Sequence, residues 1–256
     1  ETFLMSQEEK KQAIEIIVEE VNGRVPVIAH IGSIGTKITT ELGMHAEKVG
    51  VDALSALPPF YYGFTNDEIF NYYTDISNST NLPITVYNIS HANLMDLDML
   101  KRLASIENVK GVKYTAPTHF NFSKIKKEIG ENFKIYSGMD EMALSGLISG
   151  ADGIIGSFYN LMPELFVALY TNIKQENINE AKKIQEKINI IILYALSKSG
   201  YPFIKMGMKW LNIDSGYVRK PFTTFVDKEI ENTIKNDLKK IANQNDLSGI
   251  KFLDAI

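Results

Sequence analysis

The sequence contains no cysteine, so neither a disulfide framework nor a cysteine-based metal site is possible. Its four histidines lack the spacing of a metal site, so we expect no metal. No apolar run approaches the roughly 20 residues of a membrane-spanning helix, and no signal peptide is recognisable. A net charge of −4, with lysines spread among acidic residues, disfavours nucleic acid and membranes as partners. These absences fit a protein of the reducing cytoplasm.

What the sequence does contain is 45% apolar residues, enough for a real core, in a regular alternation of strand-like and helix-like segments. The near-continuous apolar run over residues 25–31 is typical of a strand buried on both faces. Further strands are predicted over residues 53–57, 84–87, 109–114, 133–136 and 153–155. Helices are predicted over residues 6–21, 36–49, 67–76, 97–105, 122–129 and 141–149. Such an alternation indicates right-handed crossovers and a parallel α/β sheet.

Two parallel architectures fit this alternation. A doubly wound dinucleotide fold would show a glycine-rich turn after its first strand, but Gly32-Ser33-Ile34-Gly35 lacks the third glycine. A (β/α)8 TIM barrel instead carries functional side chains at the carboxyl ends of several strands. Polar residues follow the predicted strands at these positions: Ser33, Tyr87, Lys113, Thr115, Asp140, Glu141 and Ser157. We therefore predict the barrel.

Beyond residue 157 the pattern is only helical. Helices are predicted over residues 162–173, 178–198, 202–211 and 228–243. Because no low-complexity linker divides the chain, we predict a single domain over residues 1–256. Residues 1–157 hold six barrel strands with their crossover helices, and residues 158–256 hold the final barrel helix and a C-terminal helical extension.

Lys113 lies at the end of a predicted strand, at the rim of the sheet. Taking a lysine out of water disfavours its ammonium form, and the free amine attacks carbonyl groups. Imine chemistry also needs a proton shuttle, and Tyr87 ends the preceding strand, which is usually the neighbouring one in space. The simpler interpretations are a surface lysine and a packed tyrosine.

Three more residues are candidates for binding a substrate. Thr115 points to the same side of its strand as Lys113, where its hydroxyl could bond to a substrate oxygen. Asp140 and Glu141 follow Gly138 at a strand-to-helix turn. Acidic residues at such a turn are often simple helix N-caps, but a polyhydroxylated substrate would use both as hydrogen-bond acceptors.

These segments resemble, in order, the signatures of the N-acetylneuraminate lyase and dihydrodipicolinate synthase superfamily. The matching segments are Ala29-His30-Ile31-Gly32-Ser33, Pro59-Phe60-Tyr61-Tyr62, Val86-Tyr87-Asn88-Ile89, Gly111-Val112-Lys113-Tyr114-Thr115, Gly138-Met139-Asp140-Glu141, the run over residues 150–160 and Arg219-Lys220-Pro221-Phe222. The resemblance implies class I aldolase chemistry on a (β/α)8 barrel without a cofactor, as a homotetramer. It implies a pyruvate imine on Lys113, Tyr87 as proton shuttle and Tyr61 in a hydroxyl relay near a subunit contact.

The residues that differ between branches favour the lyases. The synthase branch places an arginine shortly after its Tyr-Asn pair, whereas Ser90-His91-Ala92-Asn93 follows here. The lyase branch reads sugar hydroxyls with Gly-x-Asp-Glu, which Gly138, Asp140 and Glu141 match. The resemblance thus implies reversible cleavage of N-acetylneuraminate, a sialic acid, to pyruvate and N-acetylmannosamine, with Thr115 and Ser157 also binding substrate. The alternatives are a pyruvate aldolase for another keto sugar acid and a non-catalytic sugar-acid-binding homologue.

The resemblance also implies that the family's first strand, first helix and second strand are missing from this chain. Glu1 matches the residue just after the turn that holds the pyruvate carboxylate. An eight-stranded barrel does not close with six strands. Either an N-terminal segment is absent from this sequence, or the chain is a truncated homologue. We expect the truncated form to expose the apolar edge of the strand at Val25 and to have little or no lyase activity.

Overall fold

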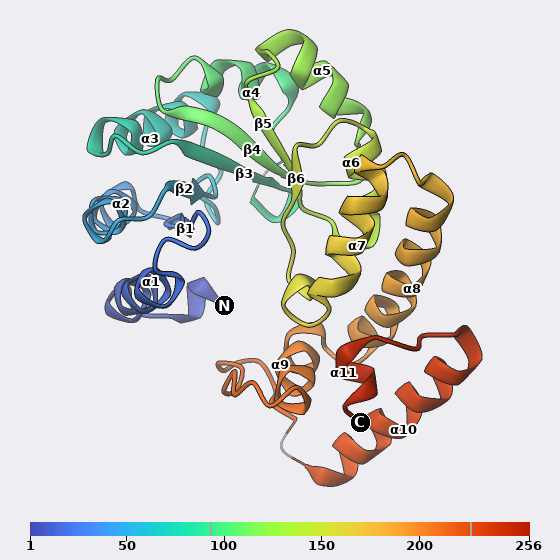
Figure 1. Ribbon diagram of the computed structural model, residues 1–256. Helices are drawn as coiled ribbons and strands as arrows, with labels where there is room; N and C mark the ends of the chain where they lie inside the picture. The colour runs from blue at the N-terminus through green and yellow to red at the C-terminus, as the bar shows by residue number, and fades with distance from the viewer. Residues whose placement is uncertain (93, 226) are drawn as a thin grey trace. The chain divides into compact units, whose positions relative to one another are not determined.

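The computed structural model describes residues 1–92, 94–225 and 227–256 of the chain (Figure 1). The chain separates into two compact units. The sheet unit consists of Thr2–Gly138 and Ser149–Ile154, and the helical unit consists of Glu1, Met139–Ile148 and Ile155–Ile256. The units are described separately below, and the single-domain assignment stays a prediction.

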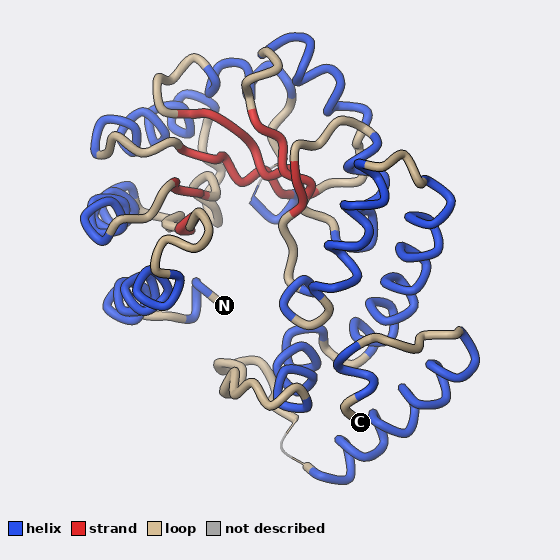
Figure 2. The backbone as a smooth tube through the Cα atoms, in the orientation of Figure 1, coloured by secondary structure: helices blue, strands red, loops and turns tan. Residues whose placement is uncertain are grey.

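All strands assigned within the described residues belong to one six-stranded parallel sheet of the sheet unit, in the order β1 to β6 (Figure 2). The strands are β1 (Ile28–His30), β2 (Ala53–Ala56), β3 (Ile84–Ile89), β4 (Val109–Thr115), β5 (Lys134–Ser137) and β6 (Gly153–Ile154). The register places Lys113 of β4 between Tyr87 of β3 and Tyr136 of β5. The six strands predicted from the sequence are therefore confirmed, in chain order.

The helices of the sheet unit pack on one face of this sheet (Figure 1). They are α1 (Gln7–Val21), α2 (Thr36–Val49), α3 (Asn66–Ser79), α4 (Leu97–Ala104) and α5 (Phe120–Ile129), with the short 3-10 helices η1 (Thr2–Leu4) and η2 (Ser90–Ala92). Two of the helices begin with a capping box, formed by Ser6 with Glu9 and by Thr65 with Glu68. The strands and helices share one apolar core, and together they form a half-barrel.

The prediction for the first strand was wrong in one respect. The apolar run over residues 25–31 was expected to be buried on both faces, but β1 includes only Ile28–His30, and Ile28 is 37% exposed. Val25, before the strand, is 59% exposed. Ile28 is exposed because β1 is hydrogen-bonded to β2 alone at the edge of the described sheet.

The helical unit contains the predicted helical extension. Its helices are α6 (Ala143–Ile148), α7 (Pro163–Lys174), α8 (Ile178–Ser197), α9 (Gly200–Trp210), α10 (Lys228–Asn245) and α11 (Lys251–Asp254), with η3 (Asp140–Met142) and η4 (Phe158–Asn160). Trp210 is buried, and its indole N–H donates to Glu231. Within the described parts of the chain, no helix has both the length and the apolar character to cross a bilayer.

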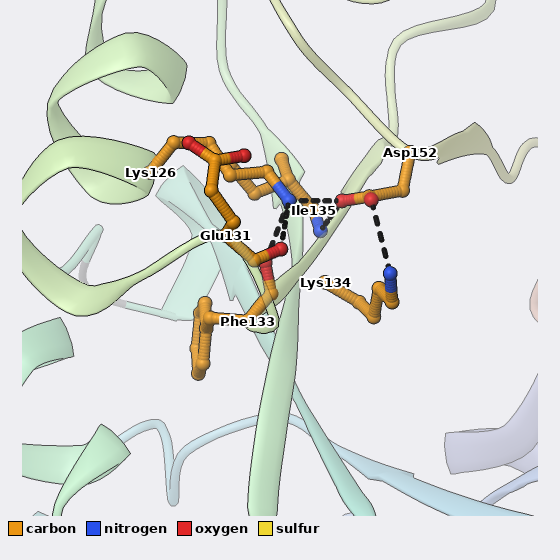
Figure 3. Close-up of polar contacts among 6 residues, drawn as sticks. All are labelled: Lys126, Glu131, Phe133, Lys134, Ile135 and Asp152. Carbon is orange, nitrogen blue, oxygen red and sulfur yellow. Dashed lines mark hydrogen bonds and ion pairs between the residues drawn. The ribbon is translucent and has the colours of Figure 1, made fainter.

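A cluster of polar contacts fastens β5 and β6 to the loop after α5 (Figure 3). The Lys126 ammonium donates to the Asp152 carboxylate at 2.7 Å, and to the backbone carbonyls of Phe133 at 3.0 Å and Glu131 at 3.1 Å. Asp152 also accepts the backbone N–H of Ile135 at 2.8 Å. Because all three ammonium hydrogens have acceptors, Lys126 holds three backbone segments together from a largely buried position.

We expect D152A to lower the free energy of unfolding by about 2 kcal/mol, because it leaves Lys126 and the Ile135 N–H without their acceptor. Burial opposes ionisation of Asp152, but hydrogen bonds from Lys126 and Ile135 outweigh it and lower its pKa. The stabilisation is therefore present above about pH 4 and lost as pH falls through the lower folded-state pKa. Urea titrations at several pH values measure this.

The matched control is K134A, which removes the exposed lysine on the other oxygen of the same carboxylate at 3.3 Å. An exposed pair contributes little, so this variant should change stability by no more than about 0.5 kcal/mol. Equal losses of unfolding free energy for K134A and D152A would contradict the conclusion that Asp152 stabilises the fold through Lys126 and Ile135.

Candidate active site

Lys113 and Tyr87 face the same side of the sheet at the carboxyl ends of adjacent strands. Parallel pairing aligns the two residues directly, and the Lys113 Nζ lies 4.0 Å from the centroid of the Tyr87 ring. Both side chains are half-buried. The amine thus lies against the ring instead of in bulk solvent, which favours a positioned group over an ordinary surface lysine.

A second ring adjoins this pair. His30, at the end of β1, packs edge-to-face on Tyr87 with ring centroids 6.0 Å apart. Its pKa is lowered to about 4, first because burial disfavours the imidazolium and then because the charges of Lys113 and Lys10 repel it. His30 is therefore a neutral imidazole beside the amine at neutral pH. The sequence interpretation considered His30 only as a metal ligand and missed this position.

Thr115 and Gly138 lie next to the Lys113 side chain. A Cβ at Gly138 would overlap the Thr115 hydroxyl oxygen and would lie 3.1 Å from the Lys113 Cε. Only glycine leaves these two side chains room at this point. The Thr115 Oγ1 is buried and has no hydrogen-bond partner among the described residues. A buried hydroxyl without a partner is costly, so it is suited to accept or donate a bond to a bound molecule.

Tyr61 is more exposed than these residues. It is 84% exposed on the loop after β2, and its ring packs against Tyr62 with centroids 5.0 Å apart. Its backbone has φ +80°, a left-handed conformation that is rare and strained for an aromatic residue. Among the ring contacts of the described residues, none joins Tyr61 to Lys113 or Tyr87.

In the helical unit, the two acidic residues of η3 have different environments. Asp140 is buried, and its Oδ2 accepts the backbone N–H of Phe158 at 2.8 Å. A Cβ at Gly156 would overlap the Asp140 carboxylate, so glycine is needed there. Met139, not Asp140, is the N-cap of η3. Glu141 is exposed, which leaves it as the acid that is open to a ligand.

Tyr159 accompanies this acidic pair, and Ser157 lies two residues before it. The Tyr159 hydroxyl is buried without a hydrogen-bond partner among the described residues. Burial raises its pKa above the usual range, and the charges of Asp140 and Glu141 raise it further. The phenol is therefore a donor near two acceptors. Ser157 is half-buried before η4, and its backbone carbonyl accepts the Asn160 side-chain amide at 3.1 Å.

The residues predicted from sequence thus divide between the two units. Lys113, Tyr87, Thr115 and Gly138 lie close together in the sheet unit, while Tyr61 has no ring contact with Lys113 or Tyr87 among the described residues. Asp140, Glu141 and Ser157 belong to the helical unit. Within the described residues, no three metal-ligating side chains gather in one place. Of the loop after β3, Ser90–Ala92 forms η2, and Asn93 lies outside the described residues.

Sequence reasoning missed Tyr159 and His30. His30 had a recognisable signal, because it ends β1 on the same side of the sheet as Tyr87 and Lys113. Tyr159 had none, because its relation to the acidic pair arises from folding of η4 near η3.

A half-barrel with a lysine beside a tyrosine at its strand ends is the architecture of a class of α/β barrel proteins. Residues 1–241 match the model of the Dihydrodipicolinate synthetase family. The chain belongs to that family.

Solved structures of similar proteins include lyases and a synthase. An N-acetylneuraminate lyase from Fusobacterium nucleatum is 35% identical over 95% of this chain and 82% of its own, with a TM-score of 0.86. A Ruminococcus gnavus sialic acid aldolase, solved as a catalytic lysine mutant, is 32% identical over 93% of this chain and 80% of its own, with a TM-score of 0.88. A Bacillus anthracis dihydrodipicolinate synthase is 25% identical over 91% and 80%, with a TM-score of 0.83.

We expect His30 to make stability pH-dependent. Because its folded-state pKa lies near 4, below the unfolded value of about 6.5, its contribution is present above about pH 6.5 and lost as pH falls toward 4. Unfolding free energy should fall by about 2 kcal/mol over that range in the wild type and less in H30Q.

Urea titrations of both proteins measure this difference, and NMR titration of the imidazole measures the pKa directly. H91Q, which removes an exposed histidine, is the control and should behave as the wild type. A His30 imidazole that titrates near its ordinary value of about 6.5 would contradict the structure.

Proposed function

We propose that the protein is a Schiff-base aldolase that cleaves N-acetylneuraminate reversibly to pyruvate and N-acetylmannosamine. The observation that carries the proposal is the position of Lys113 against Tyr87 at the carboxyl ends of β4 and β3. Membership of the Dihydrodipicolinate synthetase family supports the reaction class. The lyases and aldolases among the similar structures, at 32% and 35% identity, support the substrate.

The proposed chemistry begins with addition of the Lys113 amine to the keto carbon of the open-chain sugar acid. The carbinolamine loses water to give an imine, which acts as an electron sink. A base removes the proton of the hydroxyl on the second carbon from the imine carbon, and the bond between that hydroxyl-bearing carbon and the CH2 next to the imine breaks. This releases an aldehyde, N-acetylmannosamine, and leaves an enamine. Protonation of the enamine and hydrolysis by water then release pyruvate and restore the amine. These steps require no cofactor.

Each further residue has a role that fits its environment. Tyr87 is assigned the proton shuttle, because it carries a phenolic hydroxyl on the ring that adjoins the amine. The Thr115 hydroxyl, which lacks a protein partner among the described residues, bonds to a substrate oxygen above Gly138. Asp140 shapes the turn with its buried carboxylate, and exposed Glu141 accepts bonds from sugar hydroxyls.

Two other roles complete the proposal. Ser157 binds substrate from the loop that contains Gly156, next to the buried Asp140 carboxylate. Tyr61 completes the hydroxyl relay at a subunit contact of a homotetramer, for which its 84% exposure and strained backbone are the supporting observations.

Borohydride reduction in the presence of pyruvate should fix one pyruvate-derived adduct on Lys113, because the imine becomes a stable secondary amine. Peptide mass spectrometry locates the adduct. K113M should abolish it, whereas K110M should leave it unchanged, because Lys110 is an exposed residue of the same strand. Absence of an adduct on wild-type protein that still binds the sugar acid would favour the non-catalytic alternative.

E141Q should lower kcat/KM for N-acetylneuraminate by about tenfold or more, because a neutral amide replaces a charge-assisted acceptor for sugar hydroxyls. The rate of adduct formation with pyruvate should not change, since pyruvate lacks those hydroxyls. A coupled pyruvate-release assay gives the first quantity and borohydride trapping the second.

E186Q removes an exposed acid of α8 and is the control for a change of net charge. Equal losses in both measurements with E141Q would contradict the role of Glu141. Turnover of a different keto sugar acid in preference to N-acetylneuraminate would replace the proposed substrate.

A further inference from the structure

Gln185 is a buried polar residue that the proposed reaction does not use. It lies on α8 of the helical unit, where it is 7% exposed, and α8 packs against α6 and η3 (Figure 1). Glutamine is seldom buried to this degree without partners, because its amide carries two donors and two acceptor sites. The hydrogen-bond partners of Gln185 therefore indicate which part of the structure it holds in place.

The side chain of Gln185 joins three groups. Its Oε1 accepts the backbone N–H of Leu144 at 2.8 Å, and its Nε2 donates to the Asp140 backbone carbonyl at 3.2 Å. The second Nε2 hydrogen goes to the Asn189 Oδ1 at 2.9 Å, one helical turn along α8. The Leu144 N–H can only be a donor, so it fixes which end of the amide is oxygen.

The backbone that Gln185 contacts is a junction between two kinds of helix. The Ala143 N–H bonds to the Asp140 carbonyl in the tight 3-10 pattern of η3, and α6 begins at Ala143. First-turn N–H groups such as that of Leu144 need acceptors from outside the helix. Gln185 supplies that acceptor and adds a second donor to the Asp140 carbonyl. It therefore fastens both ends of the segment that includes Glu141.

Asp140 is held at a second point as well. While Gln185 contacts its carbonyl, the Phe158 N–H contacts its carboxylate at 2.8 Å. Asp140, the residue before Glu141, is held by two hydrogen bonds, and the Leu144 amide is held by one. Glu141 therefore projects from a turn with little backbone freedom. A bound sugar gains more from an acceptor that is already in place, because less ordering is required on binding.

We infer that Gln185 is a positioning residue that sets the η3 turn for sugar recognition, so that the helical extension takes part in substrate selection. The inference rests on the proposed function for its kinetic consequence, but not for the hydrogen bonds themselves. The simpler interpretation is that Gln185 only packs α8 against α6. The two interpretations differ in what an isosteric change should do.

The informative variant is Q185E. An ionised carboxylate keeps the bond from the Leu144 N–H, but it cannot donate, so it faces the oxygens of Asp140 and Asn189 as a third acceptor. Burial beside these oxygens raises the pKa of the introduced carboxyl, which protonates as pH falls and then donates again. The loss of kcat/KM for N-acetylneuraminate in Q185E should therefore decrease at low pH. Q185M removes all three bonds, and its defect should not depend on pH.

Hydrogen exchange is the first measurement, because it does not depend on the reaction. Exchange of the Leu144 amide should become at least about tenfold faster in Q185M than in the wild type. The control is Y194F, on the same helix, which removes the hydroxyl bond from Tyr194 to Asp237 at 3.0 Å. Y194F should leave Leu144 unaffected. Unchanged Leu144 exchange in Q185M would overturn the assignment whatever the activity.

The kinetic measurement compares each variant with the wild type at the same pH. The kcat/KM for N-acetylneuraminate in Q185E should be about tenfold lower near pH 8 and recover toward the wild type near pH 5.5. Pyruvate adduct formation on Lys113 should be unchanged in both Gln185 variants. Parallel loss of adduct formation, or a Q185E defect without pH dependence, would contradict a specific positioning role.

The outcomes separate the two hypotheses. A wild-type protein that forms the pyruvate adduct but cleaves no N-acetylneuraminate contradicts the proposed substrate, and the exchange result then decides the role of Gln185. Normal cleavage by Q185M at every pH contradicts the positioning role and leaves the proposed function intact.

Discussion

The parallel register between β3 and β4 is the constraint on which the rest of the candidate site depends. Because side chains alternate across a strand, a shift by one residue would send Lys113 into the helix-covered face and replace it with an apolar neighbour. The core on that face includes Val86, Val112 and Tyr114, which fixes the register through burial. The position of the amine beside Tyr87 is thus a consequence of how the core packs.

Each of the two units retains a buried hydroxyl without a hydrogen-bond partner among the described residues. The Thr115 and Tyr159 hydroxyls are buried without partners among the described residues, and each such group costs free energy. Gly138 and Gly156 add to this pattern, because side chains at those positions would occupy the space of Thr115 and Asp140. Unpaired hydroxyls next to required glycines are typical of surfaces shaped to receive a molecule.

The two acidic residues show how one short turn serves structure and recognition together. Asp140 is engaged by the Phe158 N–H and by Gln185, while Glu141 remains exposed. The sequence interpretation gave helix capping more weight for Asp140 than for Glu141 and offered both as acceptors for sugar hydroxyls. Burial separates the two residues, since Asp140 is buried and Glu141 is exposed to solvent.

The order of strands and helices, the face shared by Lys113 and Thr115, and the pairing of Tyr87 with Lys113 all followed from the sequence, because periodicity and chain order are local properties. Tertiary structure alone decided that Ile28 is exposed and that Gln185 reaches Asp140 across 45 residues. The physical reason is that a hydrogen bond from a distant helix leaves no periodic pattern in the chain. It exists only once the core has brought that helix against the turn.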